Sequence, residues 1–186
     1  MKHRVCPWWL GYFLLNPLRK MGQNPCEILA PYVREGMTVL EPGPGMGFFT
    51  VELALLVGPN GRVVAVDVQP KMIEKLKQRL AKNGLTKRVD TRVAQPESMG
   101  VGDLQGTADF ILAFAVVHEF PDHGKFFAEV AAASKPGAMI LLAEPKGHVK
   151  PSTFDAELEA AAKVGFAVAE RPAIRRSLTA VLKKSQ

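Results

Sequence analysis

Apolar and polar positions show two kinds of pattern along this chain, one typical of strands and one typical of helices. The order of these patterns predicts the fold class. Short apolar runs rich in β-branched residues predict buried strands, whereas apolar residues recurring every three or four positions predict helices. The predicted strands cover residues 37–40, 62–66, 89–94, 109–113, 138–143, 166–171 and 177–183. The predicted helices cover residues 25–30, 48–57, 70–82 and 122–134, and one more begins at 152–155 and ends at 164–166. Strands and helices that alternate in this way predict an α/β fold with a doubly wound, mainly parallel sheet.

Turn-forming residues mark the ends of these elements. Residues 58–61 (Gly-Pro-Asn-Gly) stop one helix, and residues 83–84 (Asn-Gly) cap the next. We expect a turn at Pro136-Gly137, and the S-x-x-acid spacing of Ser152 and Asp155 predicts a helix start. Because only a few residues separate the last two strands, we expect them to form an antiparallel hairpin.

A glycine-rich segment, residues 41–47 (Glu-Pro-Gly-Pro-Gly-Met-Gly), follows the first predicted strand. We expect the strand to stop before Pro42, since proline has no amide hydrogen to give to a sheet. Glycines allow positive φ and let a ligand approach the backbone closely. The segment therefore predicts a binding loop, and the alternative is an ordinary glycine-rich turn.

The spacing of this loop argues against two common ligands. A dinucleotide fingerprint requires a third glycine three residues after Gly45, where this chain has Phe48. A phosphate-binding P-loop requires a lysine, and none occurs between Arg34 and Arg62. A carboxylate at Glu41 repels phosphate and attracts cations. The loop therefore favours a positively charged ligand.

Asp67 ends the second predicted strand, 20 residues after Gly47. In a βαβ unit an acid at this position lies beside a ribose, whose two hydroxyls a carboxylate accepts at once. The alternative is that Asp67 caps the N-terminus of the helix at 70–82.

Length and charge narrow the class of protein further. The chain has 186 residues, of which 47% are apolar, enough for one well-packed domain. Its two cysteines, Cys6 and Cys26, have no metal-site spacing and favour a reducing, cytoplasmic setting. The net charge of +6 belongs to the chain ends, because residues 171–186 hold five basic residues and no acidic one. Such ends attract nucleic acid or anionic membranes, although solvated surface lysines and arginines are the simpler reading.

The first 24 residues form a basic and aromatic leader. Its apolar run contains Pro7, has no small-residue cleavage site after it, and is too short to span a bilayer. Its aromatic side chains are expected to cover a ligand, a second subunit or a membrane surface, or else to fill the core. They are Trp8, Trp9, Tyr12 and Phe13.

The pattern E-x-G-x-G-x-G at Glu41–Gly47 resembles the first motif of class I S-adenosylmethionine-dependent methyltransferases. The resemblance extends over residues 25–186 and implies a seven-stranded Rossmann-like sheet of order 3-2-1-4-5-7-6 with strand 7 antiparallel. It thus divides the chain into the leader, 1–24, and a methyltransferase domain, 25–186. The cofactor that it implies is S-adenosylmethionine.

The resemblance also implies which residues hold that cofactor. Glu41 and the loop would lie beside its methionine part, Asp67 on the ribose, and Val68 and Gln95 around the adenine. Gln95 stands where such enzymes more often have Asp, and Phe114 would lie near the amino-acid end. The implied set is Glu41, Gly43, Gly45, Gly47, Asp67, Val68, Gln95 and Phe114.

Residues 114–122 resemble the segment after the fourth strand in the ubiquinone- and arsenite-methyltransferase-like branch, which acts on small molecules. His118 matches its first histidine and Glu119 replaces its second. His118 is a candidate general base, because histidine titrates near neutral pH; the alternative is a buried histidine bound to backbone. Glu144, after the fifth strand, is a second candidate catalytic residue, which would steer a cationic or hydroxyl-bearing substrate, and its alternative is a solvated strand-end acid.

We therefore expect an enzyme that transfers a methyl group to a small molecule. Residues 112–115 (Leu-Ala-Phe-Ala) match neither the [ND]-P-P-[YF] tetrapeptide of nucleic-acid amino methylators nor a Pro-Cys nucleophile, so nucleic acid is not the expected partner. Two cysteines are too few for the arsenic site of arsenite methyltransferases. The alternatives are a cofactor-binding protein without turnover, a nicotinamide dehydrogenase, and a basic enzyme of RNA or membrane surfaces.

Overall fold

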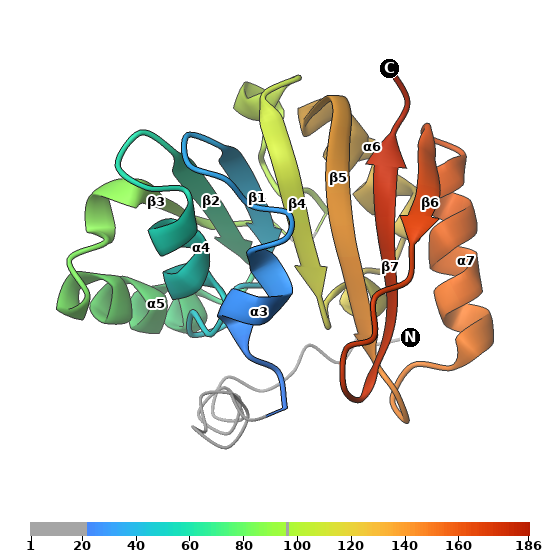
Figure 1. The fold of residues 1–186 in the computed structure, drawn as a ribbon, viewed down its shortest axis with the longest axis horizontal. Coiled ribbons are helices and arrows are strands. Elements are labelled where there is room, and N and C mark those ends of the chain that lie inside the picture. Colours follow the sequence, from blue (N-terminus) through green and yellow to red (C-terminus); the bar gives the residue numbers. More distant parts are fainter. Residues whose placement is uncertain (1–21, 96) are drawn as a thin grey trace. The chain divides into compact units, whose positions relative to one another are not determined.

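The computed structural model describes residues 22–95 and 97–186. They divide into two compact units, one ending at Met99 and the other running from Gly100 to Gln186. The seven strands follow the order β3-β2-β1-β4-β5-β7-β6, so the predicted doubly wound fold class is confirmed. The leader's aromatic residues lie outside the described residues, and the division at residue 24 stays a prediction. Figure 1 shows the fold.

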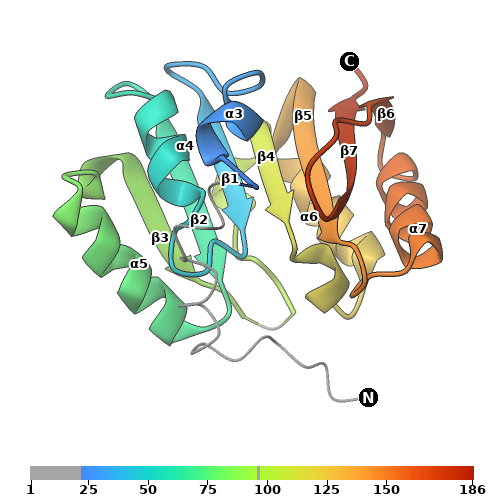
Figure 2. The ribbon, with the colours of Figure 1, turned by 60° about the horizontal axis from the view of Figure 1, so that its bottom comes forward.

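The unit before Gly100 contains three parallel strands, with Leu40, Val64 and Asp90 in register. Its helices α3, α4 and α5 lie on one face of these strands (Figures 1 and 2). For α4 and α5, which connect β1 to β2 and β2 to β3, right-handed crossovers between adjacent parallel strands require this. The elements are α3 (Pro25–Leu29), β1 (Thr38–Pro42), α4 (Thr50–Leu56), β2 (Arg62–Asp67), α5 (Pro70–Lys82), η2 (Thr86–Arg88) and β3 (Val89–Val93).

Sequence explains two of these elements directly. Strand β2 is a β-branched apolar run whose side chains are buried from Val63 onward, as expected for a parallel strand covered by helices. Helix α5 buries Met72, Ile73, Leu76 and Leu80, which share one face at helical spacing. Pro70 occupies its first turn, where the missing amide hydrogen costs nothing.

The prediction that the first strand stops before Pro42 is wrong. Strand β1 includes Pro42, which lies opposite Val66. The hydrogen bond to β2 comes instead from the next residue, because the Gly43 amide donates to the Val66 carbonyl at 2.9 Å. Alternate residues of a strand direct their amides to opposite sides, so the missing amide of Pro42 leaves the pairing with β2 intact.

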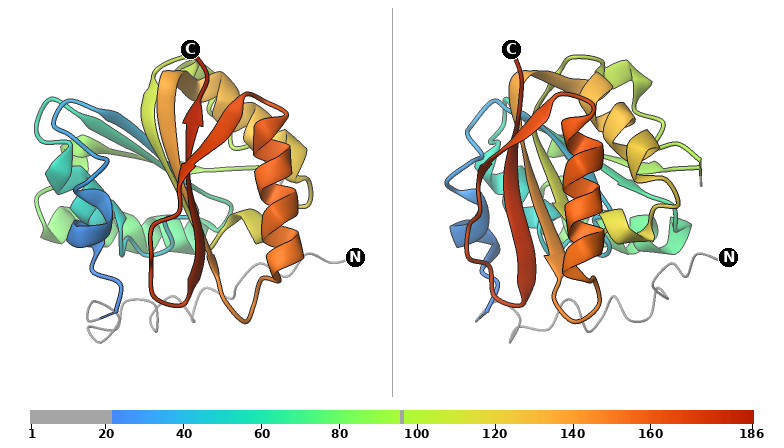
Figure 3. Two further views of the ribbon diagram at one scale, coloured as in Figure 1. Left: turned by 45° about the vertical axis from the view of Figure 1, so that its right-hand side comes forward. Right: turned by 90° about the vertical axis from the view of Figure 1, so that its right-hand side faces the viewer.

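The unit from Gly100 to Gln186 contains a parallel pair and an antiparallel hairpin. Strand β4 pairs parallel with β5, β5 pairs antiparallel with β7, and β7 pairs antiparallel with β6, which confirms the predicted hairpin. Helices α6 and α7 contact each other, and α7 packs beside β6 (Figure 3). The elements are η3 (Gly102–Leu104), β4 (Ala108–Phe114), η4 (Val117–Glu119), α6 (His123–Ala133), β5 (Ser134–Pro145), α7 (Pro151–Ala162), β6 (Phe166–Glu170) and β7 (Ser177–Lys184).

Two boundary predictions in this unit are also wrong. Pro136-Gly137 do not form a turn before β5 but lie within it, where the register with β4 shifts between Ala108 and Phe110. An irregularity of this kind accommodates a proline and a glycine at positive φ inside a strand.

Helix α7 begins at Pro151 after Lys150, so Ser152 lies inside the helix and does not cap it. Pro151 favours the first helical turn and sets the start one residue earlier.

No helix within residues 22–95 or 97–186 combines the length and apolar character that crossing a membrane requires.

Candidate functional site

Glu41 is a buried acid near the carboxyl end of β1. Its side chain is 2% exposed, and its Oε2 has no hydrogen-bond partner among the described residues. Burial raises the pKa of Glu41 to about 8; the nearby Thr50 hydroxyl works in the opposite direction, and the charge of Asp67 adds to the rise. A buried acid with an open oxygen is costly unless it is protonated or meets a donor or cation. Glu41 is therefore suited to a positively charged ligand.

The loop after β1 uses its glycines in different ways. Gly43, Gly45 and Gly47 all have positive φ, at 66°, 54° and 85°. A Cβ on Gly45 would meet no atom within 4 Å, whereas a Cβ on Gly47 would lie 2.6 Å from Cδ1 of Leu76 in α5. Gly47 thus allows close packing of the loop on a helix, and Gly45 leaves open space beside the backbone.

Asp67 joins this loop to the segment that leads into α5. Its Oδ1 accepts the Gln69 amide at 2.8 Å. Burial raises the pKa of Asp67 to about 6, although the backbone amides of Gln69 and Gly45 favour the charged form. The N-cap of α5 is Gln69, so the alternative that Asp67 caps this helix is wrong.

Val68 and Gln95 follow the carboxyl ends of β2 and β3. Because Asp67 lies opposite Val93 in register, these residues and Glu41 share one edge of the parallel strands. Val68 is half-buried and Gln95 is exposed. Gln95 exchanges backbone hydrogen bonds with Ser98, at 3.1 and 3.2 Å, which fixes the backbone at this corner. One unit thus brings together seven of the eight predicted cofactor-binding residues.

The eighth, Phe114, lies in the other unit. It is half-buried and ends β4. The next residue, Ala115, has a φ of 55°, unusual for a residue other than glycine. Its amide donates to the Ala143 carbonyl at 2.7 Å and so keeps the sharp change of direction beside β5.

His118 and Glu144 form a close pair in this unit. Oε2 of Glu144 lies 2.5 Å from Nδ1 of His118. Oε1 of Glu144 accepts the backbone amides of Val117 at 2.8 Å and His118 at 3.4 Å. Glu144 is fully buried, so the alternative of a solvated strand-end acid is wrong. Burial alone would lower the pKa of His118, but the hydrogen bond and charge of Glu144, with help from Glu119, raise it above the usual value.

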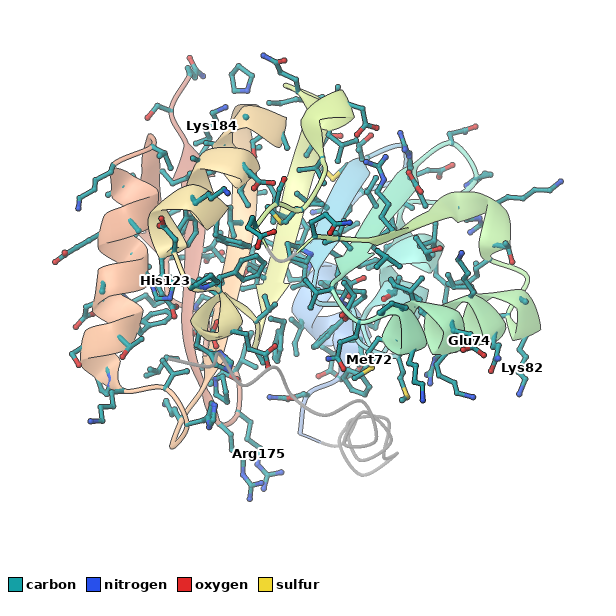
Figure 4. The ribbon with its side chains drawn as sticks, turned by 180° about the vertical axis from the view of Figure 1, so that it is seen from behind. Met72, Glu74, Lys82, His123, Arg175 and Lys184 are labelled. Carbon is teal, nitrogen blue, oxygen red and sulfur yellow. The ribbon has the colours of Figure 1, made fainter. Side chains whose placement is uncertain are left out.

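Three further titratable residues surround this pair, and sequence reasoning missed all of them. The His148 ring packs edge-on against His118 with 5.0 Å between centroids. The charge of Glu144 also acts on His123, at the start of α6, and on Glu157 in α7. Figure 4 labels His123. Glu157 is fully buried with both carboxyl oxygens unpartnered among the described residues, and burial raises its pKa to about 8.

A sequence signal for Glu157 exists. Phe154, Glu157 and Ala161 are the buried positions of α7 and share one helical face. An acid at an apolar position of a helix is therefore the pattern that could have revealed it.

The described residues contain no group of three histidines, cysteines or acids arranged to hold a metal ion.

Comparison with known families gives one domain match. The model of a methyltransferase domain family matches residues 33–178, a range that includes residues from both units.

Two curated relatives are similar over part of their length. An arsenite methyltransferase of Halobacterium salinarum is 30% identical over 109 residues, which are 59% of this chain and 27% of the relative. A ubiquinone/menaquinone biosynthesis C-methyltransferase of Pasteurella multocida is 29% identical over 137 residues, 72% of this chain and 50% of the relative. The chain thus spans half or less of the length of these two relatives.

Among solved structures, a SAM-dependent methyltransferase from Aquifex aeolicus is similar over nearly its whole length. It is 26% identical with a TM-score of 0.83, and the match covers 96% of this chain and 98% of the other.

Proposed function

This chain belongs to the family of S-adenosylmethionine-dependent methyltransferases, whose domain spans residues 33–178, and we propose that it methylates a small-molecule acceptor. The names of the curated relatives support this acceptor class, since they include a quinone C-methyltransferase and an arsenite methyltransferase. The observation that supports the proposal most is the open carboxyl oxygen of Glu41 beside the glycine loop.

S-adenosylmethionine is the cofactor of this family, and when bound it supplies a methyl group already activated by a sulfonium. The residues at the end of β1 fit a cationic nucleoside. Among the described residues, Glu41 Oε2 has no hydrogen-bond donor, and none of their atoms fills the space that a Cβ on Gly45 would take. We assign the cofactor to Glu41, the loop glycines, Asp67, Val68, Gln95 and Phe114.

We propose that His118 is the general base, which takes the proton that the acceptor loses when it is methylated. Its Nδ1 lies against Glu144, which fixes the tautomer so that Nε2 is the free nitrogen. A carboxylate at Nδ1 stabilises the imidazolium that forms when Nε2 takes a proton. Glu144 is a positioning residue, because its other oxygen is held by two backbone amides. We propose that residues 25–186 form the methyltransferase domain that carries out this reaction. We place the protein in the cytoplasm.

Calorimetry on the full chain tests the cofactor assignment. We expect S-adenosylhomocysteine to bind with one site per chain and NAD to give no saturable heat. Glu41→Gln should weaken S-adenosylhomocysteine binding at least tenfold, while the control Glu97→Gln, at an exposed acid, leaves it unchanged. Clear heat with NAD and none with S-adenosylhomocysteine would overturn the assignment.

Turnover needs a separate experiment. The protein is incubated with S-adenosylmethionine labelled in its methyl group and a panel of quinols, phenols, thiols and arsenite, and labelled products are identified by mass. We expect one chemical class to be methylated. Tight cofactor binding with no product from any acceptor would favour the alternative of a binding protein without turnover.

A further inference from the structure

A cationic hollow lies in the unit from Gly100 to Gln186, beside the end of β5. Its volume is about 580 Å³. Four of its residues are basic, Lys146, Arg171, Arg175 and Arg176, and no acidic residue lines it. The remaining lining residues are Pro172, Ala173, Ile174, Ser177, Leu178 and Thr179. We call these residues the cationic hollow.

Backbone hydrogen bonds fix the shape of the cationic hollow. The Lys146 amide donates to the Arg176 carbonyl at 2.8 Å, which ties the end of β5 to the β6–β7 connection. The Thr179 hydroxyl donates to the Pro172 carbonyl. Arg176 has a φ of 60°, a conformation that residues other than glycine rarely adopt. The connection is thus a defined structure, and it supplies three of the four basic residues of the hollow, Arg171, Arg175 and Arg176.

Three of the four basic residues of the cationic hollow carry charges that no described acid neutralises. Lys146, Arg171 and Arg176 form no ion pair with any described acid. By contrast, Nζ of Lys184 donates to the carbonyls of Ala131 and Ser134, at 2.6 and 2.9 Å. Lys184 and Arg175 lie at opposite ends of this unit (Figure 4). Lys184 therefore uses its charge in structure, whereas Lys146, Arg171 and Arg176 are exposed.

The cationic hollow adjoins the proposed proton acceptor. Strand β7 runs antiparallel to β5, so its first residues lie opposite the carboxyl end of β5, with Leu178 opposite Glu144 and Ser177 opposite Pro145. Leu178 lines the hollow, and Lys146 follows Glu144 by two residues. An acceptor that reaches His118 therefore approaches the strand end that forms the hollow.

We propose that the cationic hollow binds an anionic group of the methyl acceptor, a carboxylate or a phosphate, and so selects anionic small molecules. Guanidinium groups pair with both anions through two parallel hydrogen bonds, and a lysine adds a point charge. This inference rests on the proposed function, because it names the acceptor class for that reaction. It also predicts anion binding in the absence of any acceptor.

Amide chemical shifts of the ¹⁵N-labelled full chain test the inference, with inorganic phosphate and acetate as the two probes. Sodium chloride keeps the ionic strength constant, because exposed charges are screened by salt. We expect saturable shifts at residues 146 and 171–179 with at least one probe. The probe that binds more tightly separates a phosphate group from a carboxylate group.

A matched pair of double variants makes the test specific. Lys146→Gln with Arg171→Gln should weaken binding of the effective probe at least tenfold. Lys163→Gln with Lys183→Gln removes the same charge from exposed positions elsewhere in the unit, and should change binding less than twofold. Equal weakening in both variants, or no saturable shifts at the hollow, overturns the inference.

S-adenosylhomocysteine binding, measured on the same proteins, separates this inference from the proposed function. We expect both double variants to bind it as the parent does. Cofactor binding without anion binding would remove the inference and leave the proposed function. Anion binding without cofactor binding would leave an anion site at the hollow, but it would remove the proposed function and, with it, the assignment of that anion to a methyl acceptor. A single-stranded oligonucleotide that binds far more tightly than phosphate, and loses affinity equally in both variants, would overturn the small-molecule reading.

Discussion

Three buried glutamates, Glu41, Glu144 and Glu157, differ in which groups surround their carboxyl oxygens. Glu144 accepts two backbone amides and contacts the His118 ring. Within the part of the chain that the structure describes, one carboxyl oxygen of Glu41 and both carboxyl oxygens of Glu157 have no hydrogen-bond partner. Burial raises the pKa of both unsatisfied acids to about 8. At pH 7 the ligand-free protein therefore keeps Glu41 and Glu157 mostly neutral.

Cofactor binding at pH 7 should release a proton from Glu41. With a pKa of about 8, this acid is mostly protonated before binding, and a cation beside it favours the charged form. Calorimetry with S-adenosylmethionine in buffers of different ionisation enthalpy measures the release. We expect roughly one proton for the parent and close to none for Glu41→Gln. Equal release by both proteins would show that Glu41 is already ionised in the free protein.

The rate of methyl transfer should depend on the protonation of His118. Because Glu144 and Glu119 raise the pKa of His118, kcat/KM should rise with pH through a midpoint above the usual histidine value. Replacing the base in His118→Gln should lower kcat about 100-fold or more and remove this midpoint.

The Glu144→Gln variant supplies the control for a positioning role. Without the carboxylate the pKa of His118 should fall, so the midpoint should move to lower pH while part of the rate remains. An unchanged pH profile in His118→Gln would rule out His118 as the base.

At the scale of elements, periodic runs were predicted well and their ends less well. Helix α5 has the predicted bounds, because its buried positions repeat at one spacing and both its ends have turn-forming residues. Pro42 and Pro136-Gly137 were placed outside strands that include them. The conformational preference of proline or glycine indicates that the residue weakens a strand. Whether the missing amide of a proline costs a hydrogen bond depends on which side of the strand it would face, and sequence alone does not show this.

The glycine loop offers a paired test of packing against binding. Both Gly45 and Gly47 have positive φ, so alanine at either costs on the order of 1 kcal/mol of backbone strain. Gly47→Ala also forces its Cβ to 2.6 Å from Leu76, and should lose about 2 kcal/mol more in urea unfolding. Gly45→Ala meets no neighbour, so its main loss should be in S-adenosylhomocysteine affinity. Equal stability of the two variants would contradict the packing role of Gly47.

At the scale of the whole molecule, sequence predicted the fold class and the order of strands but not where charge accumulates. Residues 171–186 form one basic run in sequence, yet the structure gives Lys184 a role in backbone hydrogen bonding and Arg171 and Arg176 a place in the cationic hollow. The group of titratable residues around Glu144 was equally hidden, because His123, His148 and Glu157 are not neighbours in the sequence. Residue roles at both sites stay predictions.

Buried neutral acids should also make the whole protein less stable as pH rises. Below the usual glutamate pKa of 4.5, Glu41 and Glu157 are protonated in both the folded and the unfolded state. Above it the unfolded chain loses these protons, while the folded chain keeps them until about pH 8, where burial has placed their pKa. The unfolded state then binds fewer protons, so the free energy of unfolding falls with pH, by on the order of 1 kcal/mol per pH unit for each acid. Asp67, whose pKa is also raised, lowers the free energy of unfolding further as pH rises to about 6. His118, whose pKa is raised as well, lowers it as pH rises above the usual histidine range.

Urea unfolding between pH 5 and pH 8 measures this slope. Glu157→Gln should flatten it, because a neutral amide occupies the site at every pH, while the exposed control Glu97→Gln keeps the parent slope. Saturating S-adenosylhomocysteine should flatten the part due to Glu41 and stabilise the protein by about 3 kcal/mol at 100 times its Kd. The same slope in parent and Glu157→Gln would mean that this carboxyl is charged in the folded protein, and that a partner for it exists beyond the described residues.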